Sequence, residues 1–173
     1  RALMKLEFGA GERQTPGFKN VDVRDLPGID YVCEAWKIDE QVEENSVDQV
    51  HSRHFMEHLS YYHVDLTMKA WYKILKPGGY LTIVVPCMDF HIRQWTTKDR
   101  ATTVEANGMN MQQWAKEGFW GKQREVEKGE VWDIHKSGWD FELMKEYLEK
   151  WSFRDITRVQ DGLKKNLFVR CIK

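Results

Sequence analysis

The sequence has few cysteines and prolines, no long hydrophobic run and no excess of either charge. Its three cysteines, Cys33, Cys87 and Cys171, are widely spaced within apolar stretches, which favours reduced thiols over a disulfide framework. No apolar segment approaches the roughly 20 residues that cross a bilayer, and no signal-peptide pattern precedes the first strand-like run. The formal net charge of −1 gives no basic field that would attract nucleic acid or anionic lipid. We therefore expect a soluble, cytoplasmic protein whose partner is neither a membrane nor a nucleic acid.

The chain is long enough to bury a full hydrophobic core. It has 173 residues, of which 42% are hydrophobic, and neither a glycine- or serine-rich linker nor an internal repeat divides it. These features predict a single domain over residues 1–173.

The pattern of apolar residues predicts an α/β fold. Several strand-like runs are continuously apolar, which is typical of parallel strands buried on both faces. Strands are expected at 2–8, 18–23, 29–34, 47–52 and 80–85, with an antiparallel hairpin at 154–159 and 167–172. Val64, Met68, Trp71 and Leu75 share one face of a helix predicted over 61–75, and a second amphipathic helix is expected around 141–151.

The region 87–139 has weaker periodicity and is predicted to be a helical insertion after the fifth strand. In open α/β sheets, ligands bind beyond the carboxyl ends of the strands, so an aromatic insertion there could form a lid or a substrate pocket. The alternative is that its tryptophans only pack the insertion onto the sheet. These are Trp95, Trp114, Trp120, Trp132 and Trp139.

A glycine pair and two carboxylates predict a ligand site. The apolar run at 2–8 ends at Gly9 and Gly11, where the backbone can turn sharply and let a ligand approach. Glu7 stands beside this loop and Asp22 ends the second run, so we expect both carboxylates to face one crevice. A carboxylate at the end of a second strand suits a ribose diol, and one beside the loop suits an ammonium group. The expected ligand is a nucleoside with a cationic tail.

With these residues, the sequence resembles the class I S-adenosylmethionine-dependent methyltransferases over most of its first 86 residues. It is most similar to a compact subgroup with a Pro-Gly-Phe-x-Asn-Val-Asp segment after the glycine loop and a later His-Lys-Ser-Gly. The motifs that carry the resemblance are Glu7-Phe8-Gly9-Ala10-Gly11, Pro16-Gly17-Phe18-Lys19-Asn20-Val21-Asp22, Ser46-Val47-Asp48-Gln49-Val50, Leu75-Lys76-Pro77-Gly78-Gly79 and His135-Lys136-Ser137-Gly138.

The resemblance implies a Rossmann-like three-layer α/β/α sandwich with a mostly parallel seven-stranded sheet and an antiparallel last strand. It implies S-adenosyl-L-methionine as cofactor and S-adenosyl-L-homocysteine as product, with a small-molecule acceptor such as a sugar or metabolite hydroxyl. Glu7, Gly9 and Gly11 would line the methionine end, Asp22 would hold the ribose, Cys33 to Ala35 would border the adenine, and Ser52 and Arg53 would lie beneath the sulfonium. The full implied cofactor set is Glu7, Phe8, Gly9, Ala10, Gly11, Asp22, Val23, Cys33, Glu34, Ala35, Ser52 and Arg53.

Methyl transfer chiefly requires alignment of a nucleophile with the electrophilic methyl group, so a general base is optional. For a hydroxyl acceptor, the candidate bases are His135, Asp89 and His54, with His91 as a further choice by residue type. His135 is favoured because it lies in a polar segment with Lys136, although it could instead cap the helix that begins near Asp140.

Three other functions are open. His54-Phe55-Met56-Glu57-His58 matches a zinc metallopeptidase pattern, in which both imidazoles lie on one face of a helix and Glu105, Glu117, Glu125 or Glu142 supplies a third ligand. A non-catalytic S-adenosylmethionine-binding module could act on a protein partner through its aromatic insertion. A nicotinamide oxidoreductase would also use the glycine loop and Asp22, but the third glycine of its fingerprint is missing.

Overall fold

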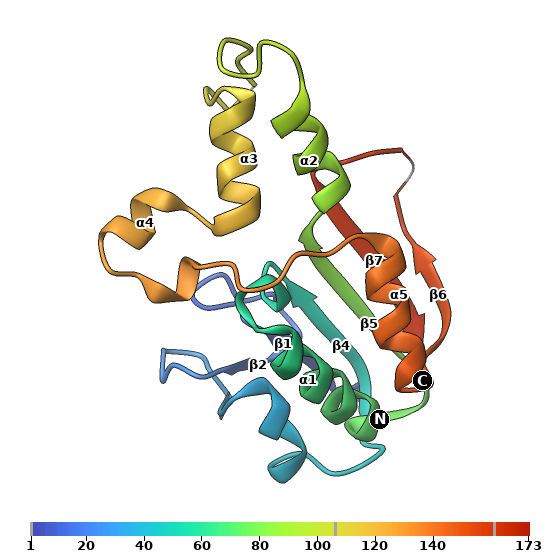
Figure 1. Ribbon diagram of the computed structural model, residues 1–173. Coiled ribbons are helices and arrows are strands. Elements are labelled where there is room, and N and C mark those ends of the chain that lie inside the picture. Colours follow the sequence, from blue (N-terminus) through green and yellow to red (C-terminus); the bar gives the residue numbers. More distant parts are fainter. Residues whose placement is uncertain (1, 106, 161) are drawn as a thin grey trace.

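The computed structural model describes residues 2–105, 107–160 and 162–173, and its centre is one seven-stranded β-sheet (Figure 1). The strand order is β3-β2-β1-β4-β5-β7-β6, and the first five strands in this order are parallel. Strand β7 lies between β5 and β6 and is antiparallel to both. The strands are β1 (Lys5–Phe8), β2 (Lys19–Asp22), β3 (Tyr31–Val32), β4 (Val47–Arg53), β5 (Leu75–Pro86), β6 (Arg154–Arg158) and β7 (Asn166–Ile172). The predicted Rossmann-like sheet and the C-terminal antiparallel hairpin are confirmed.

Helix α1 (Tyr61–Ile74) forms where the sequence predicts it. Its N-terminus is capped by Ser60, whose Oγ accepts a hydrogen bond from the backbone N–H of His63 at 3.2 Å. Val64, Met68 and Trp71 are fully buried against the sheet, as their three- and four-residue spacing predicts. Helix α5 (Phe141–Lys150) lies on the same face (Figure 1) and begins at Asp140, whose carboxylate accepts from the N–H of Leu143. His135 therefore does not cap this helix.

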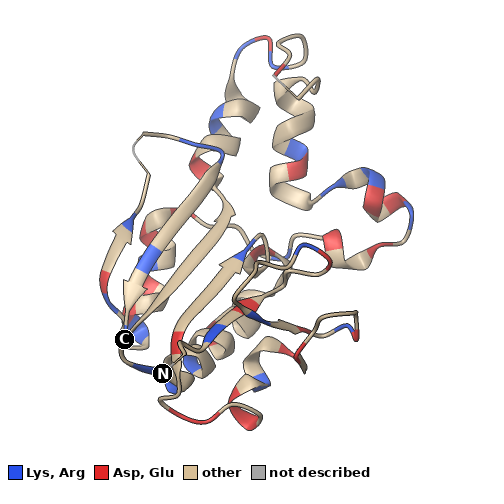
Figure 2. Ribbon diagram, turned by 180° about the vertical axis from the view of Figure 1, so that it is seen from behind, with Lys and Arg blue, Asp and Glu red and all other residues tan. Residues whose placement is uncertain are grey.

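The helical face and the opposite face of the sheet differ in polarity. Val50 and Ser52 of β4 are buried on the side of α1, whereas His51 and Arg53 point to the other side, where the view from behind looks onto the strands (Figure 2). Strand β4 is thus buried on one face only, and its sequence is not continuously apolar. The reason is that the connections 9–18 and 23–30 are too short to place long helices over that face.

The segment between β5 and α5 is partly helical and projects beyond the carboxyl ends of the parallel strands (Figure 1). It contains α2 (Met88–Thr96), α3 (Met111–Trp120), α4 (Gln123–Glu127) and the short 3₁₀ helix η3 (Val131–Asp133). Two further 3₁₀ helices follow β3 and β4, namely η1 (Ala35–Glu40) and η2 (Met56–His58). Among the described residues, no helix combines the length and apolar character that spanning a membrane requires.

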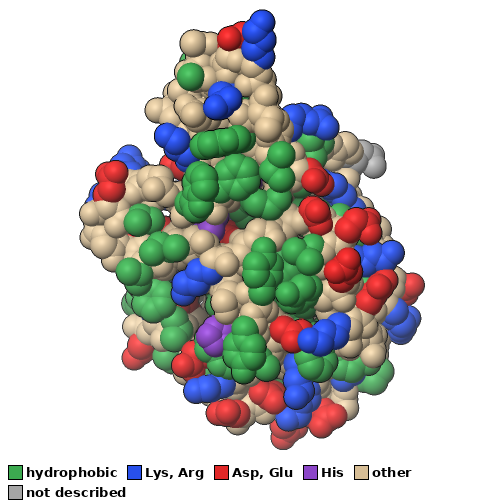
Figure 3. All heavy atoms as spheres, viewed as in Figure 1, with side chains coloured by type: hydrophobic (Ala, Val, Ile, Leu, Met, Phe, Trp, Pro, Cys, Tyr) green, Lys and Arg blue, Asp and Glu red, His purple; other side chains and the backbone are tan. Residues whose placement is uncertain are grey.

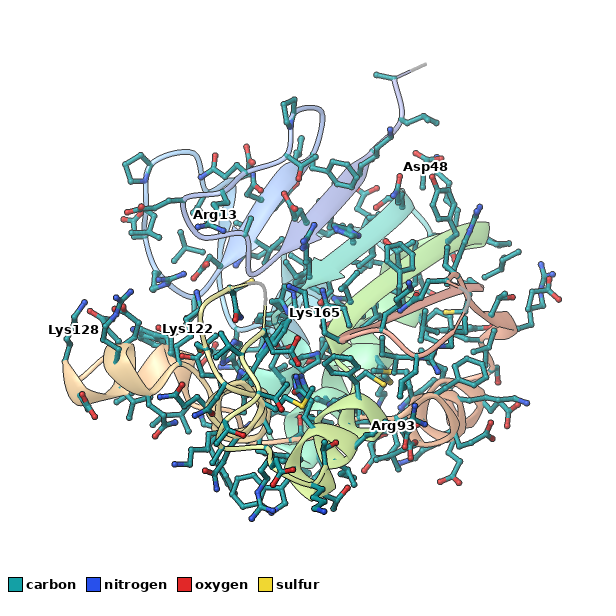
Figure 4. The ribbon with its side chains drawn as sticks, turned by 90° about the horizontal axis from the view of Figure 1, so that it is seen from above. Arg13, Asp48, Arg93, Lys122, Lys128 and Lys165 are labelled. Carbon is teal, nitrogen blue, oxygen red and sulfur yellow. The ribbon has the colours of Figure 1, made fainter. Side chains whose placement is uncertain are left out.

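The tryptophans of this segment divide between packing and exposure. Trp139 is fully buried in the core, and its indole N–H donates to Ser137 Oγ at 2.9 Å. Trp120 and Trp132 are about half exposed, at 53% and 51%. Lys165, from the connection between β6 and β7, places its ammonium 5.4 Å from the Trp114 ring and lies near the centre of the view from above (Figure 4). The packing interpretation therefore holds for Trp139 but does not explain Trp132.

Candidate active site

A cavity of about 470 Å³ opens at the carboxyl ends of β1, β2 and β3. The face that carries it is uneven, and histidine side chains show between the hydrophobic groups there (Figure 3). One wall comes from the strand ends, a second from residues 54–59 after β4, and the rim comes from the segment around η3. The lining includes eight of the predicted site residues, namely Phe8, Gly9, Asp22, Val23, Cys33, Glu34, Ala35 and His54.

Gly9 makes the turn that ends β1 and opens the cavity. Its φ of 73° lies in the left-handed region, and its N–H donates to the carbonyl of Val21 at 3.1 Å. A Cβ at this position would lie 2.5 Å from Cδ2 of Phe55, which packs directly on the glycine backbone. The sequence therefore needs glycine here for two separate reasons, the backbone angle and the close approach of Phe55.

Glu7 does not line the cavity. Its carboxylate is buried and accepts two hydrogen bonds from Thr15, from the backbone N–H at 2.9 Å and from Oγ1 at 2.8 Å. The carboxylate thus holds the loop after β1, and its expected contact with a ligand's ammonium group stays a prediction. Arg13, on the same loop, lies beside β1 and β2 in the view from above (Figure 4).

Four more predicted cofactor residues lie outside the lining. Ala10 and Gly11 are in the loop that Glu7 holds, beyond the turn at Gly9. Ser52 is fully buried within the sheet, and Arg53 points to the opposite face. The alternation of side chains along β4 explains both positions, since neighbouring residues of a strand point to opposite faces.

Asp22 lies in the cavity wall, at the end of β2, with its carboxylate already paired. It accepts hydrogen bonds from the backbone N–H of Arg24 at 2.9 Å and from Nε and Nη2 of the same residue, both at 3.1 Å. The hydrogen bonds to Asp22 raise the pKa of the Arg24 guanidinium. Arg24 also lines the cavity and lies 5.9 Å from the ring of Trp132 on the rim. Arg24 was not predicted as a site residue. The only signal for it in the sequence is its position two residues after Asp22.

The far end of the cavity is bordered by the residues that follow β3. Cys33, Glu34 and Ala35 line it as expected, and burial raises the pKa of the Cys33 thiol to about 11, so this thiol stays protonated at neutral pH. Trp36 stacks on His63 of α1, with ring centroids 3.9 Å apart and planes 6° apart. This stacked pair was not predicted, and both rings line the cavity. All three cysteines are free thiols, and Cys87 and Cys171 are buried.

The histidine-rich segment after β4 is not an α-helix. His54 has a φ of 49°, and Met56–His58 form only a 3₁₀ turn. The i, i+4 arrangement of His54 and His58 that the metallopeptidase alternative requires is therefore not present. The carbonyl of Glu57 accepts instead from the N–H groups of Lys136, at 2.7 Å, and Ser137, at 3.2 Å. These bonds dock the 135–137 segment onto η2.

The three predicted base candidates are not equivalent in the structure. His54 lines the cavity, and its Nδ1 faces Oε1 of Glu57 at 3.4 Å. His135 lies behind the wall, with its ring 4.9 Å from that of His58, which does line the cavity. Asp89 is exposed in the first turn of α2, away from the cavity lining. His91 is buried against Gln94 and also lies outside the lining.

Comparison with known proteins agrees with this geometry. The family described as "Methyltransferase domain" matches residues 5–136, which include the glycine loop, Asp22 and the segment after β4. The chain belongs to this methyltransferase family. The predicted resemblance to S-adenosylmethionine-dependent methyltransferases is thereby confirmed, and S-adenosylmethionine as methyl donor agrees with it. No curated protein matches the sequence of this methyltransferase.

Solved structures show the same fold at low sequence identity. A SAM-dependent methyltransferase from Archaeoglobus fulgidus is 14% identical with a TM-score of 0.63, over 99% of this chain and 86% of that one. A possible histamine N-methyltransferase from Thermotoga maritima is 15% identical with a TM-score of 0.64, over 98% and 82% of the two chains. A phosphoethanolamine N-methyltransferase from Haemonchus contortus, in complex with S-adenosyl-L-methionine, is 15% identical with a TM-score of 0.57, and this methyltransferase spans 49% of it.

Proposed function

We propose that the protein binds S-adenosylmethionine in the cavity at the ends of β1 to β3 and transfers its methyl group to a hydroxyl of a small molecule, such as a sugar. The supporting observation is that Gly9, Asp22 and the 33–36 segment, which lie on three different strand ends, line one cavity. A bare backbone turn, a carboxylate and an aromatic wall are the groups that a methionine tail, a ribose and an adenine need.

Each part of the cofactor has a proposed contact. The ribose diol would donate hydrogen bonds to Asp22, which requires the Arg24 side chain to leave the carboxylate. The Arg24 side chain is 39% exposed, so it can move into solvent without disturbing the core. The adenine would lie beside Cys33 and Ala35, near the stacked Trp36, and the methionine part would pass the Gly9 turn. Glu7 would contribute through the loop that it holds.

His54 is the proposed acceptor-side base. S-adenosylmethionine supplies an electrophilic methyl group on its sulfonium, so the protein has to position the acceptor oxygen and receive its proton. The carboxylate of Glu57, 3.4 Å from Nδ1 of His54, favours the tautomer with the hydrogen on Nδ1. The lone pair then lies on Nε2, which can accept a proton from a hydroxyl in the cavity. His135 would act behind this wall by docking its segment on η2.

Calorimetry tests the cofactor part of the proposal. We expect S-adenosylmethionine and S-adenosylhomocysteine to bind with one site per chain and NAD not to bind. Asp22→Asn should weaken both, whereas Asp25→Asn, an exposed neighbour outside the cavity lining, should leave both unchanged. Binding of NAD in preference to the sulfonium would overturn the assignment of the cavity.

Product formation tests the enzymatic part. Incubation with S-adenosylmethionine and a panel of small hydroxyl compounds should release S-adenosylhomocysteine with at least one of them. His54→Gln should lower the rate by about 10²- to 10⁴-fold, the usual contribution of a general base, and leave cofactor affinity unchanged. Cofactor binding without transfer to any acceptor would favour the non-catalytic module. The cytoplasmic location stays a prediction.

A further inference from the structure

A buried carboxylate and two imidazoles meet at the cavity wall, and the proposed methyl transfer uses only the contact of this carboxylate with His54. Glu57, His58 and His135 each offer a ligand atom within 4.8 Å of the others. Glu57 is only 2% exposed, and its Oε2 is buried with no hydrogen-bond partner among the described residues. An unpaired buried carboxylate oxygen is unfavourable, so this position calls for a cation or a hydrogen-bond donor.

Both imidazoles are oriented with the same nitrogen toward a backbone carbonyl. Nδ1 of His135 lies 2.9 Å from the carbonyl oxygen of Gly118, and Nδ1 of His58 lies 3.2 Å from that of Ile134. A carbonyl oxygen can only accept, so Nδ1 carries the hydrogen in both rings. The remaining lone pair of each neutral ring is therefore on Nε2, and Nε2 of His58 lies 3.8 Å from Oε1 of Glu57.

This is the pattern that metal-binding histidines show. A ligating histidine almost always donates its other N–H to a carbonyl or carboxylate, which fixes the tautomer and the orientation of the ring. Two imidazole nitrogens and one carboxylate oxygen form a common ligand set of three-ligand transition-metal sites.

We propose that Glu57, His58 and His135 form a binding site for one divalent transition-metal ion, for which Zn²⁺ is the appropriate probe. Ligand atoms around tetrahedral zinc are about 3.3 Å apart, as follows from bonds of about 2.0 Å. The ligand atoms now lie within 4.8 Å of one another, so they need to close by at most about 1.5 Å. The ligands differ from those of the metallopeptidase pattern, because His135 comes from a distant segment and His54 is not one of the three.

The position of the site relates it to the cavity. His58 lines the cavity, whereas Glu57 and His135 lie behind it, so the ion would border the acceptor side of the wall. Three protein ligands leave at least one coordination position open. If the proposed methyl transfer is correct, an oxygen of the acceptor could take this position, and the metal would then select acceptors with a coordinating hydroxyl.

Zinc titration of the complete, untagged and metal-free protein tests the proposal without any cofactor present. We expect one Zn²⁺ per chain, with affinity reduced about tenfold or more in Glu57→Gln and in His135→Gln, since loss of even a supporting residue commonly costs 10- to 100-fold. His51→Gln is the matched control, because His51 is a partly buried histidine that contacts Thr82 on β5 and lies outside the cluster. It should bind zinc as the wild type does.

Two further measurements separate the explanations. Circular dichroism and the affinity for S-adenosylmethionine, measured in the same variants, show whether each variant is folded and whether the cofactor site is intact. Visible absorption of bound Co²⁺ reports coordination directly and should disappear in Glu57→Gln. Absence of saturable zinc binding by the wild type, or equal affinity in the wild type and both cluster variants, would overturn the metal site and leave the methyltransferase proposal untouched.

Discussion

Replacement of Arg24 by alanine should strengthen cofactor binding, which is the opposite of the usual effect of removing a charged cavity residue. In the structure, the guanidinium occupies both oxygens of Asp22 through hydrogen bonds of 3.1 Å, so a ribose must displace it. Because the Arg24 side chain is 39% exposed, the pair is screened by solvent and is worth only about 0.2–1 kcal/mol. Its removal should therefore tighten S-adenosylmethionine by about 1.4- to 5-fold.

The matching loss at Asp22 should be larger. Asp22→Ala removes the charge-assisted hydrogen bonds to the ribose. A hydrogen bond to a charged group contributes about 1.5–3 kcal/mol, which corresponds to about 10- to 150-fold in affinity. In the Asp22→Ala background, Arg24→Ala should give no gain, because the competition no longer exists. Isothermal titration of the four proteins forms a complete double-mutant cycle.

Two results of this cycle would refute the reasoning. If Arg24→Ala weakened binding tenfold, Arg24 would be a cofactor ligand rather than a competitor. If Asp22→Ala left the affinity unchanged, the ribose would not lie at the end of β2. Circular dichroism of the single variants provides the control for folding, and S-adenosylhomocysteine should give the same ranking as S-adenosylmethionine because both carry the same ribose.

Two further predictions concern stability. Gly9→Ala should destabilise the fold by more than Gly17→Ala. Both glycines have a positive φ, which costs an alanine about 1–2 kcal/mol, but only at Gly9 would the new Cβ meet Phe55, at 2.5 Å. Urea unfolding measures both losses, and equal losses would contradict a role for crowding at Gly9. For the metal-free protein, the free energy of unfolding should fall as the pH drops below about 6.5. Burial lowers the pKa of His51, His91 and His135 in the folded state, so the unfolded chain binds protons that the folded chain does not. His135→Gln should flatten this dependence between neutral pH and about pH 5.5, and an unchanged slope would argue against it.

The parts of the fold that depend on local patterns could be predicted from the sequence. The spacing of Val64, Met68 and Trp71 places α1 correctly, because helix burial follows the 3.6-residue period regardless of what covers it. Gly9 and Asp22 could also be placed at one edge of the sheet, because parallel strands end on the same side. Their common cavity follows from the order of strands, which the resemblance supplied.

The pairing of side chains in the site could not be predicted in the same way. Glu7 and Asp22 both look like ligand carboxylates in the sequence, yet one binds Thr15 and the other binds Arg24. The difference depends on the conformations of two short loops, and several hydrogen-bond donors near each carboxylate compete for it. Sequence spacing contains no information about which donor succeeds.

The segment 54–58 shows how a distant contact decides local structure. An α-helix over these residues would need the N–H of His58 to donate to the carbonyl of His54, but it donates to the carbonyl of Phe55 at 3.0 Å. The carbonyl of Glu57 binds the N–H groups of Lys136 and Ser137, from a segment about 80 residues later in the chain. This docking brings His135 beside Glu57. The metallopeptidase pattern is therefore wrong in its geometry. Two of its residues, Glu57 and His58, instead form the cluster that the zinc titration tests, together with His135 from a distant segment.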